Sequence, residues 1–233
     1  KQVTGIEVLL RWQHPELGLV MPQDFIPLAE KNGFIVPLGE WVLRNACKQY
    51  VVWQSQGLVA DDLKFAVNLS PKQLAKEQFM DTLVKILKET GMPPEHLELE
   101  LTETAVMTSA IDLDSILEQL QMMGIKISID DFGAGYSSLS RLKNLPVSTL
   151  KIDKSFISDL DKDPDDAMIV KSIIALGSNL GLNVIPEGVE TEEQLNLLIQ
   201  YQCPMVQGFY FGKQPLSDKE MADLLQKHKR QDD

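Results

Sequence analysis

The 233-residue chain has few of the residues that signal disulfide or zinc chemistry, and it has no long apolar segment. Its two cysteines, Cys47 and Cys203, are too few for a disulfide framework and suit a reducing compartment. Three histidines, His14, His96 and His228, are scattered without zinc-ligand spacing. No apolar run approaches the length of a membrane span, and no signal-peptide pattern is present. These absences exclude a disulfide scaffold and a zinc module, and predict a soluble, cytoplasmic segment.

Positive charge is also in short supply. The chain has 22 Lys and Arg against 34 Asp and Glu, a formal net charge of −12. This balance argues against a broad basic surface for DNA or RNA. It remains compatible with a small anionic ligand, provided that metal ions share the site. A hydrophobic content of 44% is enough for a sizeable core, and the length suits one large domain or two small ones.

Strand-like runs alternate with helical periodicity along the whole chain. Such alternation predicts an α/β fold with a parallel sheet, either doubly wound or closed as a (β/α)8 barrel; the length and the polar strand ends favour the barrel. Helical periodicity is seen over Pro37–Gln56 and Gln73–Glu89, and Thr191–Gln194 is a capping box that predicts a helix start. The seven predicted strands are Ile6–Trp12, Phe65–Leu69, Leu97–Leu101, Ile125–Ile129, Thr149–Ile152, Asn183–Ile185 and Met205–Tyr210.

The segment Lys126–Ser138 places two carboxylates, Asp130 and Asp131, side by side after a β-branched run. Neighbouring side chains on a straight strand point to opposite faces. Both aspartates therefore serve one site only if the strand stops there and the chain bends, which Gly133 and Gly135 permit. Adjacent buried acids need a cation, so the segment indicates a divalent-metal site. A solvated Asp-Asp turn is the alternative for this segment taken alone.

Polar residues recur at the ends of the other predicted strands. Carboxylates and an amide oxygen favour Mg²⁺, Mn²⁺ or Ca²⁺ over zinc or copper, and so many acids in one pocket favour two ions. A two-metal site with a lysine suits in-line displacement at phosphorus. Each element alone also fits a solvated acid or a surface ion pair, but seven strands would have to place polar residues at the same end by chance. The polar residues at or near the ends of these strands are Glu7, Arg11, Asn68, Glu100, Glu103, Lys151, Asp153, Glu187, Glu190 and Gln207.

Six motifs stand in an order that closely resembles the EAL-domain cyclic di-GMP phosphodiesterases of bacteria. The signature stands as Glu-Val-Leu at residues 7–9. It is followed by Asn-Leu-Ser, Glu-Leu-Thr-Glu, Asp-Asp-Phe-Gly-Ala-Gly-Tyr-Ser-Ser, Lys-Ile-Asp, Glu-Gly-Val-Glu and Gln-Gly-Phe-Tyr-Phe. The match runs from about Gly5 to Leu216. Val8 departs from the signature alanine, and Pro186 stands where the family has a small residue.

The resemblance implies a role for each site residue. Glu7, Asn68, Glu100 and Asp130 would ligate one Mg²⁺ or Mn²⁺, and Asp130 would bridge to a second held with Asp131 and Glu187. Lys151 would hold or help deprotonate the attacking water, and Glu187 is the implied general base. Glu103 would anchor the loop Phe132–Leu139. The dinucleotide would be lined by Arg11, Asp153, Glu190 and Gln207.

The resemblance also implies the wider setting of the chain. The fold would be a modified TIM (β/α)8 barrel with one antiparallel strand, and its opening strand is absent from residues 1–233. The chain would be a single phosphodiesterase domain, the C-terminal part of a longer protein with sensory, cyclase or membrane modules upstream. It would hydrolyse one phosphodiester of cyclic di-GMP to linear pGpG, with Ca²⁺ inhibitory. A homodimer would form near Ser137–Asn144 and Asp153–Ala167.

Two other functions compete with this interpretation. One is a receptor or scaffold that binds cyclic di-GMP without cutting it, which would follow from loss of metal ligands; no such loss is seen in the sequence. The other is a barrel enzyme of the enolase or aldolase type, which also uses acids and a lysine but does not explain the ordered motifs. Metal-dependent turnover of cyclic di-GMP would distinguish the phosphodiesterase from both of these alternatives.

Overall fold

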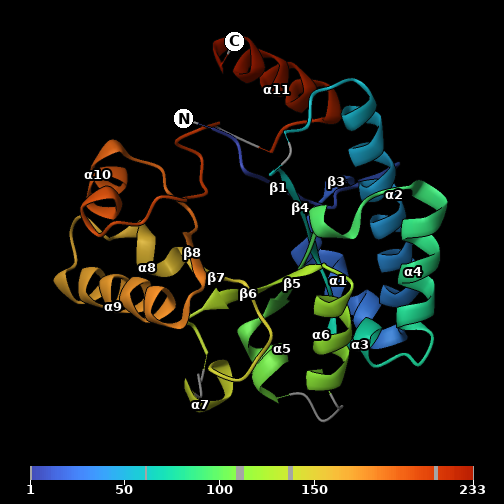
Figure 1. Ribbon diagram of the computed structural model, residues 1–233, viewed down its shortest axis with the longest axis horizontal. Helices are drawn as coiled ribbons and strands as arrows, with labels where there is room; N and C mark the ends of the chain where they lie inside the picture. The colour runs from blue at the N-terminus through green and yellow to red at the C-terminus, as the bar shows by residue number, and fades with distance from the viewer. Residues whose placement is uncertain (1, 61, 109–112, 136–138, 213–214, 233) are drawn as a thin grey trace. The chain divides into compact units, whose positions relative to one another are not determined.

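The computed structural model describes residues 2–60, 62–108, 113–135, 139–212 and 215–232 (Figure 1). These residues form two compact units, each built from separate stretches of chain. The first comprises residues 1–99, 122–126 and 217–233, and the second comprises residues 100–121 and 127–216. Within the described ranges, no helix is long and apolar enough to cross a membrane.

In the first unit, β1 (Gly5–Val8) pairs in parallel with β4 (Lys64–Asn68), with Glu7 opposite Ala66. Between them the chain forms the hairpin β2 (Trp12–His14) and β3 (Gly18–Val20), then α1 (Pro22–Asn32) and α2 (Ile35–Ser55). After β4 come α3 (Pro71–Leu74), α4 (Phe79–Thr90) and the 3₁₀ turn η1 (Pro94–His96). Helix α11 (Asp218–Asp232) belongs to the same unit.

Strand β5 (Leu97–Thr102) begins in the first unit and ends in the second. It is followed by β6 (Lys126–Phe132), which belongs to the second unit from Ile127 onward, and by β7 (Thr149–Ile152) and β8 (Asn183–Pro186) of the same unit. Strand β7 pairs in parallel with both β6 and β8. The helices of this unit are α5 (Glu103–Thr108), α6 (Leu113–Met122), α7 (Leu139–Leu142), α8 (Lys154–Ser158), α9 (Pro164–Leu180) and α10 (Glu192–Gln200).

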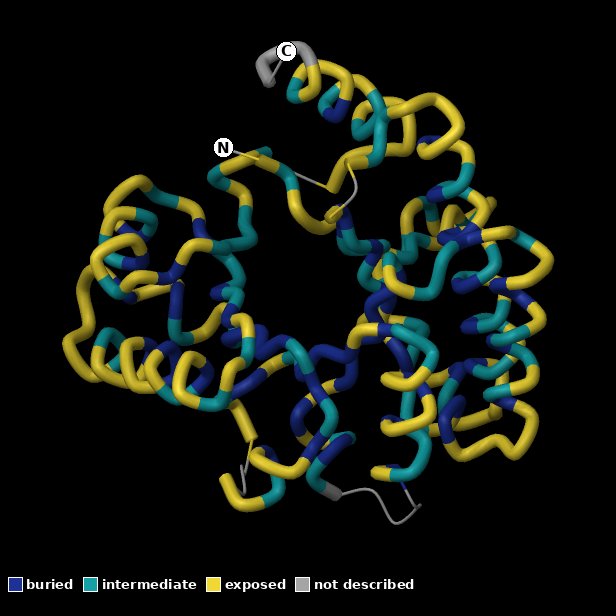
Figure 2. The backbone as a smooth tube through the Cα atoms, in the orientation of Figure 1, coloured by how far each residue is buried: buried dark blue, intermediate teal, exposed yellow. Residues whose placement is uncertain are grey.

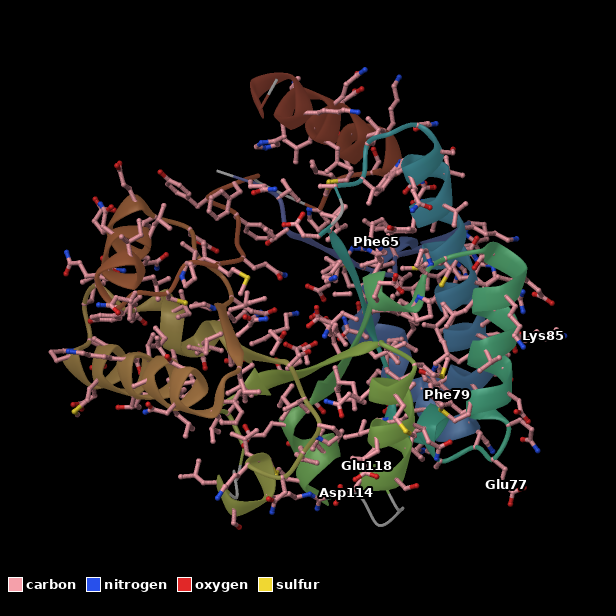
Figure 3. The ribbon with its side chains drawn as sticks, in the orientation of Figure 1. Phe65, Glu77, Phe79, Lys85, Asp114 and Glu118 are labelled. Atoms are coloured by element: carbon pink, nitrogen blue, oxygen red, sulfur yellow. The ribbon has the colours of Figure 1, made fainter. Side chains whose placement is uncertain are left out.

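Burial follows the strands, because their apolar runs are covered by the helices of the same unit. All four residues of β7 are buried, as are the first five of β5 (Figure 2). In the first unit, Phe65 of β4 is 1% exposed and packs edge-on against Tyr50 and Trp53 of α2. Lys85 of α4 lies on the outer surface of that unit (Figure 3). The alternation of parallel strands and helices confirms the predicted α/β class.

Two predicted strands differ from the structure. The run Ile6–Trp12 is interrupted after Val8, and Trp12 opens an antiparallel hairpin in which Gly18, the first residue of β3, has φ +72°. The run Met205–Tyr210 is not a strand. Its backbone makes isolated hydrogen bonds to the end of β8 and to the segment after it. In one of them, the Gln207 N–H donates to Pro186 O, the last residue of β8 (2.9 Å). Six strands of the parallel sheet are therefore seen in the described residues, not seven.

The predicted helix over Gln73–Glu89 is also wrong as one element. The structure ends α3 at Leu74 and begins α4 at Phe79. Ala75 caps α3, and the Phe79 N–H donates to Lys76 O (2.9 Å) in the intervening turn. The sequence shows no proline or glycine there, so periodicity alone could not place the break.

Candidate active site

Both aspartates of β6 reach the site edge through a β-bulge. Ile129 lies opposite Leu150 of β7 and Phe132 lies opposite Ile152, so Asp130 and Asp131 together oppose one residue. Asp131 adopts φ +53°, a left-handed conformation that aspartate tolerates better than most residues. The expectation that the strand stops at the aspartates was wrong: β6 continues to Phe132, and the bulge re-aims the side chains.

Lys151 is the centre of a buried cluster in the second unit. Its Nζ lies 2.8 Å from Glu100 Oε1, 2.6 Å from Glu187 Oε1 and 3.6 Å from Asp130 Oδ1. These four residues come from β5, β6, β7 and the residue after β8, because the carboxyl ends of parallel strands meet at one edge of a sheet. The side chains of Lys151 and Glu100 are only 3% and 2% exposed.

The charge of this cluster fits a bound cation. With its three carboxylates ionised around one ammonium, the cluster would carry a net charge of −2 in a largely buried position. Such an excess is costly in a low-dielectric site unless a cation balances it. Carboxylate oxygens are the donors that Mg²⁺, Mn²⁺ and Ca²⁺ prefer. In the described part of the chain, however, no three His, Cys, Asp or Glu side chains stand in ligating positions, and the acids of this cluster contact the Lys151 ammonium instead.

Asp131 and Asp153 form a second acidic pair in the same unit. Burial, the charge of Asp130 and a hydrogen bond with Asp153 together raise the pKa of Asp131 to about 6. Burial alone would also raise the pKa of Asp153, but the hydrogen bonds from Ser155, the contact with Asp131 and the charge of Lys154 together outweigh it, and the pKa lies below its usual value. Asp153 is the N-cap of α8, and the Ser155 N–H donates to Asp153 Oδ1 (2.8 Å).

Glu103 holds the loop that follows β6. Its buried carboxylate accepts hydrogen bonds at Oε2 from the N–H groups of Gly133 (2.9 Å) and Gly135 (3.2 Å). A Cβ on Gly135 would lie 3.2 Å from Glu103 Cδ, so the close approach favours glycine. Residues 136–138, where part of the loop and of the predicted dimer contact falls, lie outside the described residues.

The segment after β8 carries Glu187 and Glu190 and is fixed through its backbone. The Glu187 N–H donates to Ile152 O (3.1 Å), and the Val189 N–H donates to Gln207 O (3.1 Å). Glu190 is exposed, whereas Gln207 is half-buried. The structure thus brings the predicted substrate residue Gln207 against the same segment through main-chain bonds.

In the first unit, the structure brings together Glu7 of β1 and Asn68 of β4. Asn68 Nδ2 donates to Glu7 Oε1 (2.8 Å) across this parallel pair. Arg11 follows β1 and is half-buried, and its Nη1 donates to Leu10 O (2.7 Å). The first unit therefore offers one carboxylate, one amide and one guanidinium among the predicted site residues.

Sequence reasoning missed two contacts in the second unit. It placed Asp153 at a strand end with Lys151 and among the residues that line the dinucleotide, and did not identify it as an N-cap, although an Asp followed by a helix is a standard N-cap signal. It treated Gln194 only as part of a capping box, whereas its side chain also reaches α8. Local pattern could identify the first contact, while the second needs the tertiary fold.

Comparison with known proteins adds to this geometry. A family model described as "EAL domain" matches residues 1–214. The chain belongs to the EAL domain family. It is 48% identical over 220 residues to the protein named bifunctional diguanylate cyclase/cyclic di-GMP phosphodiesterase MucR of Pseudomonas aeruginosa, covering 94% of this chain and 32% of that protein. It is 37% identical over 224 residues to cyclic di-GMP phosphodiesterase PA2567 of the same organism, covering 96% of this chain and 38% of that protein.

Solved EAL-domain structures share the fold. The PaMucR phosphodiesterase in complex with c-di-GMP matches with a TM-score of 0.89 at 49% identity, over 94% of this chain and 87% of that one. The FimX EAL domain of Pseudomonas aeruginosa bound to c-di-GMP matches with a TM-score of 0.79 at 27% identity, over 89% and 82% of the two chains. The predicted modified TIM-barrel class is thereby confirmed. The chain spans about a third of the length of the curated relatives it matches.

Proposed function

We propose that this chain is a cyclic di-GMP phosphodiesterase that hydrolyses one phosphodiester bond to give linear pGpG. The observation that carries the proposal is the buried Lys151 ammonium held by Glu100, Asp130 and Glu187 at the ends of successive strands. Hydrolysis of an anionic phosphodiester needs charge neutralisation and a positioned nucleophile. The carboxylates of this cluster could bind the neutralising cations, and its fixed ammonium could position the nucleophile.

The names of the relatives support the substrate. MucR and PA2567 are both named as cyclic di-GMP phosphodiesterases, and the PaMucR structure is described as a c-di-GMP complex. The carboxylates that the chemistry needs are all present here, so the residues favour catalysis over binding alone. We also propose a homodimer, upstream modules and a cytoplasmic location; the MucR relative is about three times longer than this chain.

Two divalent cations, Mg²⁺ or Mn²⁺, would supply charge neutralisation and lower the pKa of a water. The donors proposed for these cations are the residues that the family resemblance implies, namely Glu7, Asn68, Glu100, Asp130, Asp131 and Glu187.

The protein's own residues would divide the remaining work. Lys151 orients the attacking water and stabilises charge that develops on the phosphoryl oxygens. Glu187, 2.6 Å from the ammonium, accepts the proton of that water. Arg11, Asp153, Glu190 and Gln207 would bind the dinucleotide, with the guanidinium meeting phosphate in both ground and transition states.

The test is a turnover assay on cyclic di-GMP with chromatographic identification of the product. Mg²⁺ or Mn²⁺ should give pGpG, whereas Ca²⁺ should bind without supporting turnover because its coordination is looser. Lys151→Met should lower kcat about 10²-fold and leave the Kd measured in Ca²⁺ within a few-fold. Lys162→Met removes a lysine whose side chain is 68% exposed and is the matched control. Binding without turnover in every metal would instead select the receptor function.

A further inference from the structure

The segment 187–190 after β8 has a backbone bond to β7, and it also packs against α8. Gly188 has φ +74°, and a Cβ there would lie 2.8 Å from Lys154 Cβ. The segment therefore packs directly on the first residue of α8, with no room for a side chain between them.

Gln194 of α10 makes the other connection. Its Oε1 accepts hydrogen bonds from the N–H groups of Glu190 (2.8 Å) and Thr191 (3.1 Å). Its Nε2 donates to Ile157 O (2.9 Å) and Ser158 O (3.3 Å) at the end of α8. The residue is 3% exposed, and four bonds satisfy both donors and both lone pairs of a primary amide.

A capping role alone does not explain this side chain. In a capping box, the glutamine at N3 needs only to accept from the N-cap N–H. Gln73 does this in α3, where its Oε1 accepts from the Ser70 N–H (3.1 Å), and no bond from its Nε2 to another element is seen in the described chain. Gln194 adds two bonds to carbonyls that lie 37 and 36 residues earlier in the sequence.

We propose that Gln194 is a positioning residue that sets the separation between Glu187 and Lys151. This inference rests on the proposed phosphodiester hydrolysis. Lys151 lies on β7, and α8 starts two residues after that strand ends. By tying the segment 187–190 to α8, Gln194 and the Gly188 contact hold Glu187 at 2.6 Å from the ammonium. Displacement of a catalytic group by about 1 Å can cost about 10²-fold in rate.

Three variants separate positioning from helix capping. Gln194→Leu removes all four bonds at similar bulk. Gln194→Glu keeps the acceptor for the Glu190 and Thr191 N–H groups but turns a second oxygen toward the two α8 carbonyls. Thr191→Ala removes the N-cap oxygen of α10, which accepts from the Gln194 N–H (3.2 Å), and leaves the amide side chain in place. Each protein is assayed for kcat, KM, thermal midpoint and backbone amide exchange.

We expect kcat to fall about 10-fold or more in both Gln194 variants, with a smaller change in KM. Thr191→Ala should lower the thermal midpoint but keep kcat within about two-fold, because a cap mainly stabilises its own helix. The Glu190 amide should lose exchange protection in Gln194→Leu and keep it in Gln194→Glu. A kcat for both Gln194 variants equal to that of Thr191→Ala would overturn the positioning role.

The exchange measurement separates this inference from the proposed function. If the wild-type protein fails to hydrolyse cyclic di-GMP, the proposed function falls, and with it the kinetic part of the inference. The exchange of the Glu190 amide still tests the structural tie. Unchanged protection of that amide in Gln194→Leu would overturn the tie itself.

Discussion

Replacing Lys151 by methionine keeps the length of the side chain but removes its charge from the cluster. In the structure the ammonium contacts Glu100 at 2.8 Å, Glu187 at 2.6 Å and Asp130 at 3.6 Å, and its side chain is 3% exposed. The variant leaves three acids facing one another with no protein cation among them. Without divalent metal, this repulsion should destabilise the folded state.

The magnitude follows from the two short contacts. At an effective dielectric constant of about 20, each unit-charge pair near 2.7 Å has a gross attraction of about 6 kcal/mol. Desolvation of the buried charges offsets much of this, and removing one partner of a buried ion pair costs about 3–5 kcal/mol. Domains of this size are stable by about 5–15 kcal/mol, so the loss should be large but measurable.

Urea unfolding in EDTA provides the assay, with Lys151→Arg as the charge-retaining variant and Lys162→Met as the exposed control. We expect Lys162→Met to cost less than about 1 kcal/mol, since exposed pairs contribute little. An ion that binds only the folded state stabilises it by mass action. Added Mg²⁺ should therefore restore more stability to Lys151→Met than to wild type, because the acids that have lost their ammonium should bind it more tightly. A loss below about 1 kcal/mol in Lys151→Met would refute the reasoning.

Three further predictions concern other site residues. Asp130→Asn should reduce Mn²⁺ affinity and kcat more than Asp131→Asn, because only Asp130 is assigned to both ions; equal losses would contradict that assignment. Gly188→Ala should lower the thermal midpoint and the activity of the protein more than Gly181→Ala, as thermal melts and activity assays will measure. Both glycines have φ near +73°, but only at Gly188 of these two is there no space for a Cβ. Arg11→Ala should raise the Kd for cyclic di-GMP in Ca²⁺ more than it lowers kcat at saturation.

The sequence predicted the strands that carry the site because their signal is local. The β-branched run before Asp130 and the Leu-Lys-Ile segment around Lys151 read as strands from a few residues alone. Their polar ends then follow from the shared direction of parallel strands. The Glu103 carboxylate accepts hydrogen bonds from Gly133 and Gly135 in the loop after β6, the same loop to which the resemblance assigned this residue.

The remaining differences depend on partners that a single stretch of sequence does not reveal. The Met205–Tyr210 run has strand-like composition, but it is not a strand. It passes so close to the segment after β8 that a Cβ on Gly208 would lie 2.1 Å from Val189 O, and it makes isolated backbone bonds there instead of a ladder. The contacts of Gln194 likewise join residues 37 positions apart. Neither contact has a periodic signature.

The bulge at Asp130 and Asp131 shows how register decides chemistry. With regular pairing, Asp130 would stand opposite Lys151 and Asp131 opposite Ile152; instead Phe132 takes the position opposite Ile152. The extra residue lets Asp130 lie 3.6 Å from the Lys151 ammonium, while Asp131 pairs with Asp153, which helps to raise the pKa of Asp131. The two adjacent acids thus reach different partners: Asp130 reaches Lys151 of β7, and Asp131 reaches Asp153, the N-cap of the helix that follows β7. Because the acids cannot be gathered without countercharge, Lys151 has a structural task before any cation binds, as well as its proposed task in hydrolysis.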